Sequence, residues 1–211
     1  MTDLFVSAFV TFFVVIDPPG CAPIFASLTT DASAAQRRAM AIRSVLIASA
    51  ILIFFALLGE ALLGALHISL DSFRIAGGLM LFLIALEMVF EKRQERRSNR
   101  AEEVKREGEA EDVSVFPMAM PMIAGPGSIA SVMLLVSRGE GWASQAVVLG
   151  ALAANLVLVL LALLAAGPIM RLVGKRIEGM VTRLLGVILA ALAVQFVTDG
   201  VRAALGVTAG A

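Results

Sequence analysis

The residues best placed to do chemistry stand where proline and glycine interrupt two apolar segments. One cluster is Asp17-Pro18-Pro19-Gly20, and the other, about 107 residues later, is Ala124-Gly125-Pro126-Gly127-Ser128. Proline removes a backbone donor and glycine relaxes a helix, so each cluster leaves unpaired backbone groups inside an apolar run. Because lipid cannot satisfy such groups, breaks of this kind line a cavity or are buried in protein. A matched pair of breaks therefore predicts a substrate-binding site between two halves of a membrane protein.

Asp17 has two expected roles at the first break. An aspartate followed by prolines is typical of a helix start, with the carboxylate as N-cap and proline in the first turn. We expect half-helices to begin at Asp17 and after Pro126-Gly127-Ser128, with the free amides of both starts directing positive partial charge toward a carboxylate at the centre. The ammonium group of an amino acid would then bind Asp17 or the carbonyls of Ala124 and Gly125. An aspartate inside a span costs about 2.5–3.5 kcal/mol, which makes Asp17 a candidate for substrate binding or proton coupling as well as a cap.

Three further polar residues are candidates for a coupling or relay role beside Asp17. Glu87 lies close to the end of a predicted span, and Gln195 aligns with it in the second half of the chain. Asn155 falls near the middle of another span, where an amide usually bonds across to a neighbouring helix, so a purely structural role is the alternative. Either Na⁺ or H⁺ could be the coupling ion, and we expect no metal centre and no cofactor.

The composition identifies the lipid bilayer as the surroundings of these residues. Apolar residues make up 59% of the chain and charged residues only 16%, and the mean hydropathy is +0.92, values that ordinary soluble domains do not show. Six runs of about twenty residues are apolar enough to span a membrane: 4–28, 41–64, 72–90, 115–136, 146–167 and 183–205. The sequence predicts an all-α integral membrane protein with six transmembrane helices in a single membrane domain, residues 1–211, and with broken helices in spans one and four.

Residues 91–114 separate the third span from the fourth and carry charges of both signs. Mixed-charge segments are usually solvated helix or coil, so we predict a charged linker, with a partner-binding or sensing element as the alternative. The odd-numbered loops hold fourteen of the 17 Lys and Arg residues. Because basic loops stay on the cytoplasmic side, we expect this linker to be cytoplasmic and both termini to lie outside.

The two halves of the chain resemble each other. At one offset, Phe9, Ile16, Pro19 and Gly20 match Phe116, Ile123, Pro126 and Gly127, and Arg74-Ile75-Ala76-Gly77 opens the third span as Arg183-Leu184-Leu185-Gly186 opens the sixth. Each half contains three spans, and an odd number inverts the second half relative to the first. We therefore predict two inverted three-helix repeats, residues 1–90 and 115–211.

Four blocks of the sequence also resemble one known family, the MarC family of bacterial inner-membrane proteins, also called the small neutral amino acid transporter family. The blocks are Phe13-Val14-Val15-Ile16-Asp17-Pro18-Pro19-Gly20-Cys21-Ala22-Pro23-Ile24-Phe25, Arg74-Ile75-Ala76-Gly77-Gly78 with Ala85-Leu86-Glu87-Met88, Pro117 to Ala130, and Ala193-Val194-Gln195-Phe196 with Asp199-Gly200. The resemblance implies a six-span protein of the bacterial inner membrane related to small-metabolite exporters and to a transporter of glycine and alanine. It implies no particular substrate for this chain.

The remaining residues favour transport over other functions. The single histidine, His67, lies in an expected outside loop, and the single cysteine, Cys21, has no partner, so we do not expect an enzyme. Metal-ligand spacing, a phosphate-binding Gly-Lys-Ser/Thr loop and a basic aromatic patch are missing, which argues against ATP-driven transport and nucleic-acid binding. We predict a secondary transporter of small neutral metabolites, neutral amino acids above all, that works by alternating access around the two breaks. A channel or exporter for another small solute and a non-transporting scaffold or sensor are the alternatives, and the oligomeric state stays open.

Overall fold

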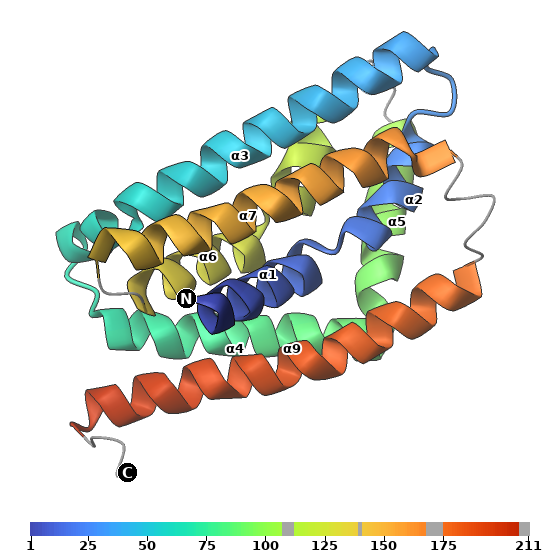
Figure 1. Cartoon of the computed structure of the whole chain (residues 1–211). Helices are drawn as coiled ribbons and strands as arrows, with labels where there is room; N and C mark the ends of the chain where they lie inside the picture. Colours follow the sequence, from blue (N-terminus) through green and yellow to red (C-terminus); the bar gives the residue numbers. More distant parts are fainter. Residues whose placement is uncertain (107–111, 139–140, 168–174, 207–211) are drawn as a thin grey trace.

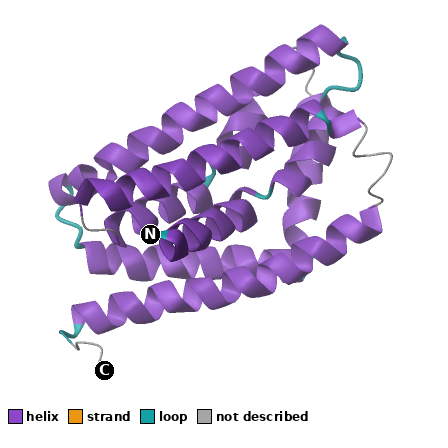
Figure 2. Cartoon of the chain, in the orientation of Figure 1, coloured by secondary structure: helices purple, strands orange, loops and turns teal. Residues whose placement is uncertain are grey.

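Long helices lying side by side form the body of the protein (Figure 1). The computed structural model describes residues 1–106, 112–138, 141–167 and 175–206, and within these residues helices and loops are found without strands (Figure 2). In chain order the helices are α1 (Thr2–Ile16), α2 (Pro18–Leu28), α3 (Ala34–Ala65), α4 (Leu70–Val89), α5 (Lys92–Arg106), η1 (Ser114–Ile123), α6 (Pro126–Arg138), α7 (Gly141–Leu164) and α9 (Lys175–Ala204).

The lengths and hydropathies of these helices confirm a membrane protein. Within the described residues, five segments are long and apolar enough to cross a bilayer: Thr2–Leu28, Ala34–Ala65, Leu70–Val89, Gly141–Leu164 and Gly179–Ala204. The bent pair formed by η1 and α6 makes a sixth if it counts as one span. Large apolar side chains such as Leu57, Leu83 and Leu184 are 60%, 62% and 66% exposed. Lipid is the environment that such long exposed apolar faces require.

Both predicted breaks interrupt a helix, but the second is more extensive than expected. The axis turns by 52° between η1 and α6, and the backbone is already extended at Phe116 and Met120, with φ of −127° and −131°. Each of these residues precedes a proline, whose ring disfavours the helical region for its predecessor. The predicted fourth span, residues 115–136, is therefore not a regular helix before the bend, because Pro117 and Pro121 disturb it as well.

Glycine permits close packing between α4 and α9. A Cβ atom added to Gly78 would lie 2.9 Å from the carbonyl oxygen of Ala193, and one added to Gly186 would lie 3.1 Å from the carbonyl oxygen of Ala85. These contacts are with backbone atoms, which cannot move aside as a side chain can. The small residues therefore let the two helices approach closely, as is common between membrane helices.

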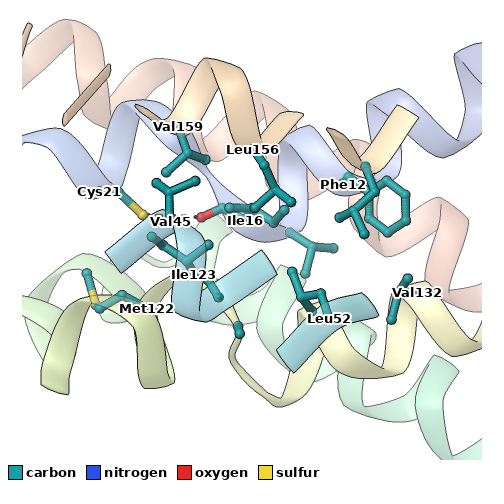
Figure 3. Close-up of a cluster of buried hydrophobic side chains, with 14 of the residues drawn as sticks. Phe12, Ile16, Cys21, Val45, Leu52, Met122, Ile123, Val132, Leu156 and Val159 are labelled. Carbon is teal, nitrogen blue, oxygen red and sulfur yellow. Dashed lines mark hydrogen bonds between the residues drawn. The ribbon is translucent and has the colours of Figure 1, made fainter. Parts of the chain in front are cut away.

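Apolar side chains from several helices fill the space around the two breaks (Figure 3). Phe12 and Ile16 of α1 and Ile123 at the end of η1 are completely buried, and Leu52 of α3 and Leu156 of α7 close the cluster from the other sides. The breaks thus lie in the interior of the helix bundle. Their backbone groups are shielded from lipid, so they must find partners within the protein or line a cavity.

Candidate functional site

Asp17 forms the joint between α1 and α2. Its backbone is left-handed, with φ 60° and ψ 65°, a conformation that aspartate tolerates better than most residues. Its Oδ1 accepts a hydrogen bond of 3.1 Å from the amide of Gly20. The prediction that Asp17 caps a half-helix is confirmed.

The same contacts correct the expectation that free amides at the start of α2 face the centre. Pro18 and Pro19 have no amide hydrogen, and the amide of Gly20 is already bonded to Asp17. The amide of Cys21 donates to the carbonyl oxygen of Asp17 at 3.0 Å. The start of α2 is therefore fully capped by its own sequence and offers no donor to a ligand.

The second break keeps its amides unpaired. The first hydrogen bond of α6 runs from the amide of Ile129 to the carbonyl oxygen of Gly125, at 3.0 Å. In the part of the chain that the structure describes, the amides of Gly127 and Ser128 have no acceptor, and neither has the hydroxyl group of Ser128. Both residues are buried, Ser128 with an exposed fraction of 3%. Free amide donors were expected at the starts of both α2 and α6, and only the start of α6 has them.

Two arginines of α5 connect the breaks. Nη1 of Arg97 lies 2.9 Å from Oδ2 of Asp17, and Nη2 of the same side chain lies 3.5 Å from the carbonyl oxygen of Met122, at the second break. One turn earlier, Arg93 donates to the carbonyl oxygen of Val15 and, at 3.1 Å, to Sδ of Met88. Figure 1 shows α5 lying across α2. The segment predicted as a linker therefore contains a helix that supplies charge to both breaks, and its residues 107–111 lie outside the described part.

A cavity of about 580 Å³ lies between α4, α5 and the second break. Its lining comprises Val15, Met80, Leu83, Ile84, Glu87, Arg93, Arg96, Arg97, Asn99, Arg100, Glu103, Pro121, Met122, Gly125, Pro126, Gly127 and Ser128. The volume is in the range of small-molecule sites. Apolar walls with a few convergent polar groups are also typical of such sites.

Arginine dominates the polar lining of the cavity. Arg97 is paired with Asp17, and Arg96 is paired with Glu87. Within the described residues, no carboxylate lies within 4 Å of Arg93 or of Arg100. Burial, and then the nearby charge of Arg97, lowers the pKa of Arg93 to about 10, which still leaves the guanidinium charged at neutral pH.

The predicted site residues are only partly brought together. The breaks are adjacent, because a Cβ atom added to Gly127 would lie 3.3 Å from Cγ1 of Val15. Glu87 lines the cavity with Gly125 to Ser128. Asp17 reaches this group through Arg97, and Pro18, Pro19 and Gly20 form the first turn of α2 behind it. Ala124, between Met122 and Gly125, is buried.

Gln195 and Asn155 do not belong to this cavity. Gln195 donates to Asp199 at 2.7 Å, and Asp199 in turn pairs with Arg138 at the end of α6. Asn155 donates to the carbonyl oxygens of Phe9, at 3.1 Å, and of Ala151. Asn155 therefore joins α7 to α1, which agrees with its structural interpretation.

The residues that sequence reasoning missed are the arginines of α5. One signal could have found them, because Arg93 and Arg97 are four positions apart and so share one face of a helix. A second signal was Asp17 itself, since a carboxylate buried in a span needs a cation, and the predicted spans offer few.

Residues 2–205 match the MarC family of integral membrane proteins. A UPF0056 membrane protein of Methanocaldococcus jannaschii is 37% identical over 201 residues, 95% of this chain and 97% of that protein. The UPF0056 membrane protein YvbG of Bacillus subtilis is 34% identical over 96% of each chain. Similar proteins thus occur in archaea and bacteria. No solved structure matches the chain significantly.

Proposed function

The chain belongs to the MarC family of integral membrane proteins, and from this premise we propose that it is a secondary transporter of small neutral metabolites, with neutral amino acids as the expected class. The observation that carries the proposal is the cavity of about 580 Å³ at the second break, joined to the first break by Arg97. Broken helices that surround a cavity are the arrangement in which many carriers bind their substrates. The proposal involves no catalytic step.

The mechanism that we propose is an exchange of partners at Asp17. In the described structure the carboxylate of Asp17 is 1% exposed and its charge is neutralised by Arg97. The ammonium group of an amino acid can take the place of the guanidinium only if Arg97 withdraws. Substrate binding would thereby be linked to a displacement of α5, and such a link between occupancy and opening is what alternating access requires.

We further propose that the two halves are inverted repeats in a bacterial cytoplasmic membrane. The main helix contacts support this: α1 and α2 pack on α7 as η1 and α6 pack on α3, while α4 pairs with α9. Exchanging α1 and α2 for η1 and α6, α3 for α7, and α4 for α9 leaves these main contacts unchanged. Figure 1 also places the α2–α3 connection, α5 and the end of α7 at one end of the molecule. These segments neighbour the basic loops, so we assign that end to the cytoplasm and both termini to the outside.

Flux measurements in proteoliposomes test this function. Labelled small neutral amino acids are offered to the purified protein under imposed Na⁺ or proton gradients, beside Asp17→Asn and the control Gly150→Ala, whose added methyl group would have no neighbour within 4 Å. We expect saturable flux that follows one gradient in the wild type and the control, and its loss in Asp17→Asn. Absence of flux for every compound, with a folded protein, would refute the proposal.

One observation favours the alternative of a non-transporting sensor. The charged helix α5 is bonded to both breaks, through Arg93 to Val15 and through Arg97 to Met122, as a docked signalling element would be. The same flux assay decides between the two, because a sensor carries no solute. A channel would give conductance that does not saturate with substrate.

A further inference from the structure

Arg93 is a guanidinium with only neutral acceptors. Among the described residues, it donates to the carbonyl oxygen of Val15 and the thioether sulfur of Met88, and no carboxylate lies within ion-pair distance of it. A charge held away from water is costly unless an opposite charge accompanies it. Arg93 is half-buried and lines the cavity, so the space beside its guanidinium is available to an anion.

Donors at the start of α6 line the same cavity as Arg93. Val15, which accepts from Arg93, lies against Gly127, since a Cβ atom there would be 3.3 Å from Cγ1 of Val15. The unpaired amides of Gly127 and Ser128 carry the positive end of a helix of thirteen residues. Ser128, a residue only 3% exposed, lines the cavity and adds a hydroxyl donor without a partner among the described residues.

The charged groups that line the cavity do not suit the ammonium and the carboxylate group of an amino acid equally. Asp17, the group expected to bind an ammonium ion, is already paired with Arg97, and Glu87 is already paired with Arg96. Two lining arginines outside these ion pairs, Arg93 and Arg100, remain, but only one lining carboxylate, that of Glu103. The unpaired groups of the lining are thus mainly positive or hydrogen-bond donors.

We propose that Arg93 and the start of α6 form a carboxylate-binding subsite, so that the cavity selects solutes by their carboxylate group and does not require an amino group. The subsite consists of the Arg93 guanidinium, the amides of Gly127 and Ser128 and the Ser128 hydroxyl. The inference rests on the proposed function in taking the cavity as the transport site. It departs from that function by extending the solutes that the cavity binds from neutral amino acids to small monocarboxylates, while the displacement of Arg97 from Asp17 still needs an ammonium group.

Three probes of similar size separate the contributions of the two charged groups. Propionate carries only a carboxylate, ethylamine only an ammonium group, and L-alanine both. Calorimetric titration of the wild-type protein in nanodiscs of zwitterionic lipid is expected to show binding of propionate and alanine within tenfold of each other, and none of ethylamine. Binding of ethylamine, or no binding of propionate, would overturn the proposal without the use of any variant. Competition by inorganic phosphate as strong as that by propionate would show a general anion site and contradict the carboxylate assignment.

Variants then assign the binding to Arg93. Arg93→Gln is expected to weaken propionate binding about tenfold or more, because a charge-assisted hydrogen bond is lost. Arg93→Lys, which keeps the charge, is expected to retain part of the affinity. Lys92→Gln, the matched control, removes one positive charge from the neighbouring exposed position, which does not line the cavity. Ser128→Ala tests the second element of the subsite and is expected to weaken binding severalfold. Equal propionate affinity in wild type, Arg93→Gln and Ser128→Ala would refute the subsite.

Flux measurements distinguish failure of the carboxylate subsite from failure of the proposed transport function. Alanine flux that is unchanged in Arg93→Gln would refute the subsite and leave the transporter intact. Propionate binding that depends on Arg93, without flux of any amino acid, would support the subsite and refute the amino acid carrier.

Discussion

Arg97 of α5 lies 2.9 Å from Asp17, eighty positions earlier in the chain, and the two side chains are only 10% and 1% exposed. A buried pair of this kind contributes little net stability, because desolvation offsets the attraction, but removing one partner leaves a buried charge without compensation. The pair therefore fixes the position of α5 against the breaks more than it stabilises the fold.

The pair can be tested by a double-mutant cycle. Asp17→Asn keeps the helix cap and removes the charge, and we expect it to destabilise the protein by about 3–5 kcal/mol, as we do for Arg97→Gln. The double variant should be less destabilised than the sum of the two, by about 0.5–3 kcal/mol. Thermal unfolding in detergent ranks the stabilities of the wild type, the two single variants and the double variant. Strict additivity would show that the two residues do not interact.

Two glycines of the second break should respond differently to alanine. In Gly125→Ala the new methyl group would lie 2.4 Å from the carbonyl oxygen of Pro121, a backbone atom, so we expect a loss of about 1–3 kcal/mol. In Gly127→Ala it would lie 2.5 Å from Cδ1 of Ile84, the end of a flexible side chain. This variant should fold, with a narrower cavity and severalfold lower flux. Melting temperature and flux, measured on both, separate the two effects.

Packing between α4 and α9 predicts a third result. Gly78→Ala would place a methyl group 2.9 Å from the carbonyl oxygen of Ala193 and should destabilise the protein by about 1–3 kcal/mol. Gly150→Ala, in an open position on α7, should be neutral or stabilising by up to about 1 kcal/mol, because alanine is the better helix former. Melting temperatures provide the comparison, and equal values for the two variants would contradict the close approach of α4 and α9.

Substitution of Asn155 is expected to change the stability of the protein but not its transport. Its amide joins α7 to α1 through the carbonyl oxygen of Phe9, and hydrogen bonds between membrane helices contribute about 0.6 kcal/mol on average. Asn155→Ala should lower the melting temperature slightly and leave the substrate affinity and the ion dependence of flux unchanged. A change in ion dependence would instead assign Asn155 to a relay.

The orientation can be measured by labelling in whole cells. In a Cys21→Ala background, a cysteine at Asp31, in the connection before α3, should react with an impermeant maleimide only after the membrane is opened. A cysteine at Trp142, which is 86% exposed at the start of α7, should react in intact cells. The reverse pattern would invert the proposed topology.

Local chemistry made part of this structure predictable. Asp17 followed by two prolines strongly favours a helix start, which the structure has. The hydropathy of the chain predicts six spans, and the structure has five helical segments of spanning length and one bent pair among its described residues. The path of α5 was not predictable in the same way. Its mixed charges are typical of a solvated segment, and several of its residues are indeed exposed. Contacts of Arg93 and Arg97 with residues about eighty positions earlier hold its other face against the breaks.

Alignment of the two halves was a poor guide to the site for a related reason. It paired Glu87 with Gln195 by their positions along a helix, yet the first lines the cavity and the second bonds to Asp199, outside the lining. Position along a helix does not determine which cavity a side chain enters, because that depends on the neighbouring helices. Arg93 and Arg97 have no aligned counterpart at all, since they lie between the halves.

The distance along the chain between Asp17 and Arg97 also sets an order of events during synthesis. A ribosome adds about 5–20 residues per second, so the carboxylate enters the membrane on the order of ten seconds before its cation has been made. During that interval the first span carries an uncompensated charge, at a cost of about 2.5–3.5 kcal/mol. A truncated chain that stops at residue 90 would keep that charge permanently, whereas one that stops after α5 would not. The N-terminal half therefore contains the cation that compensates Asp17 only when its polar tail is included.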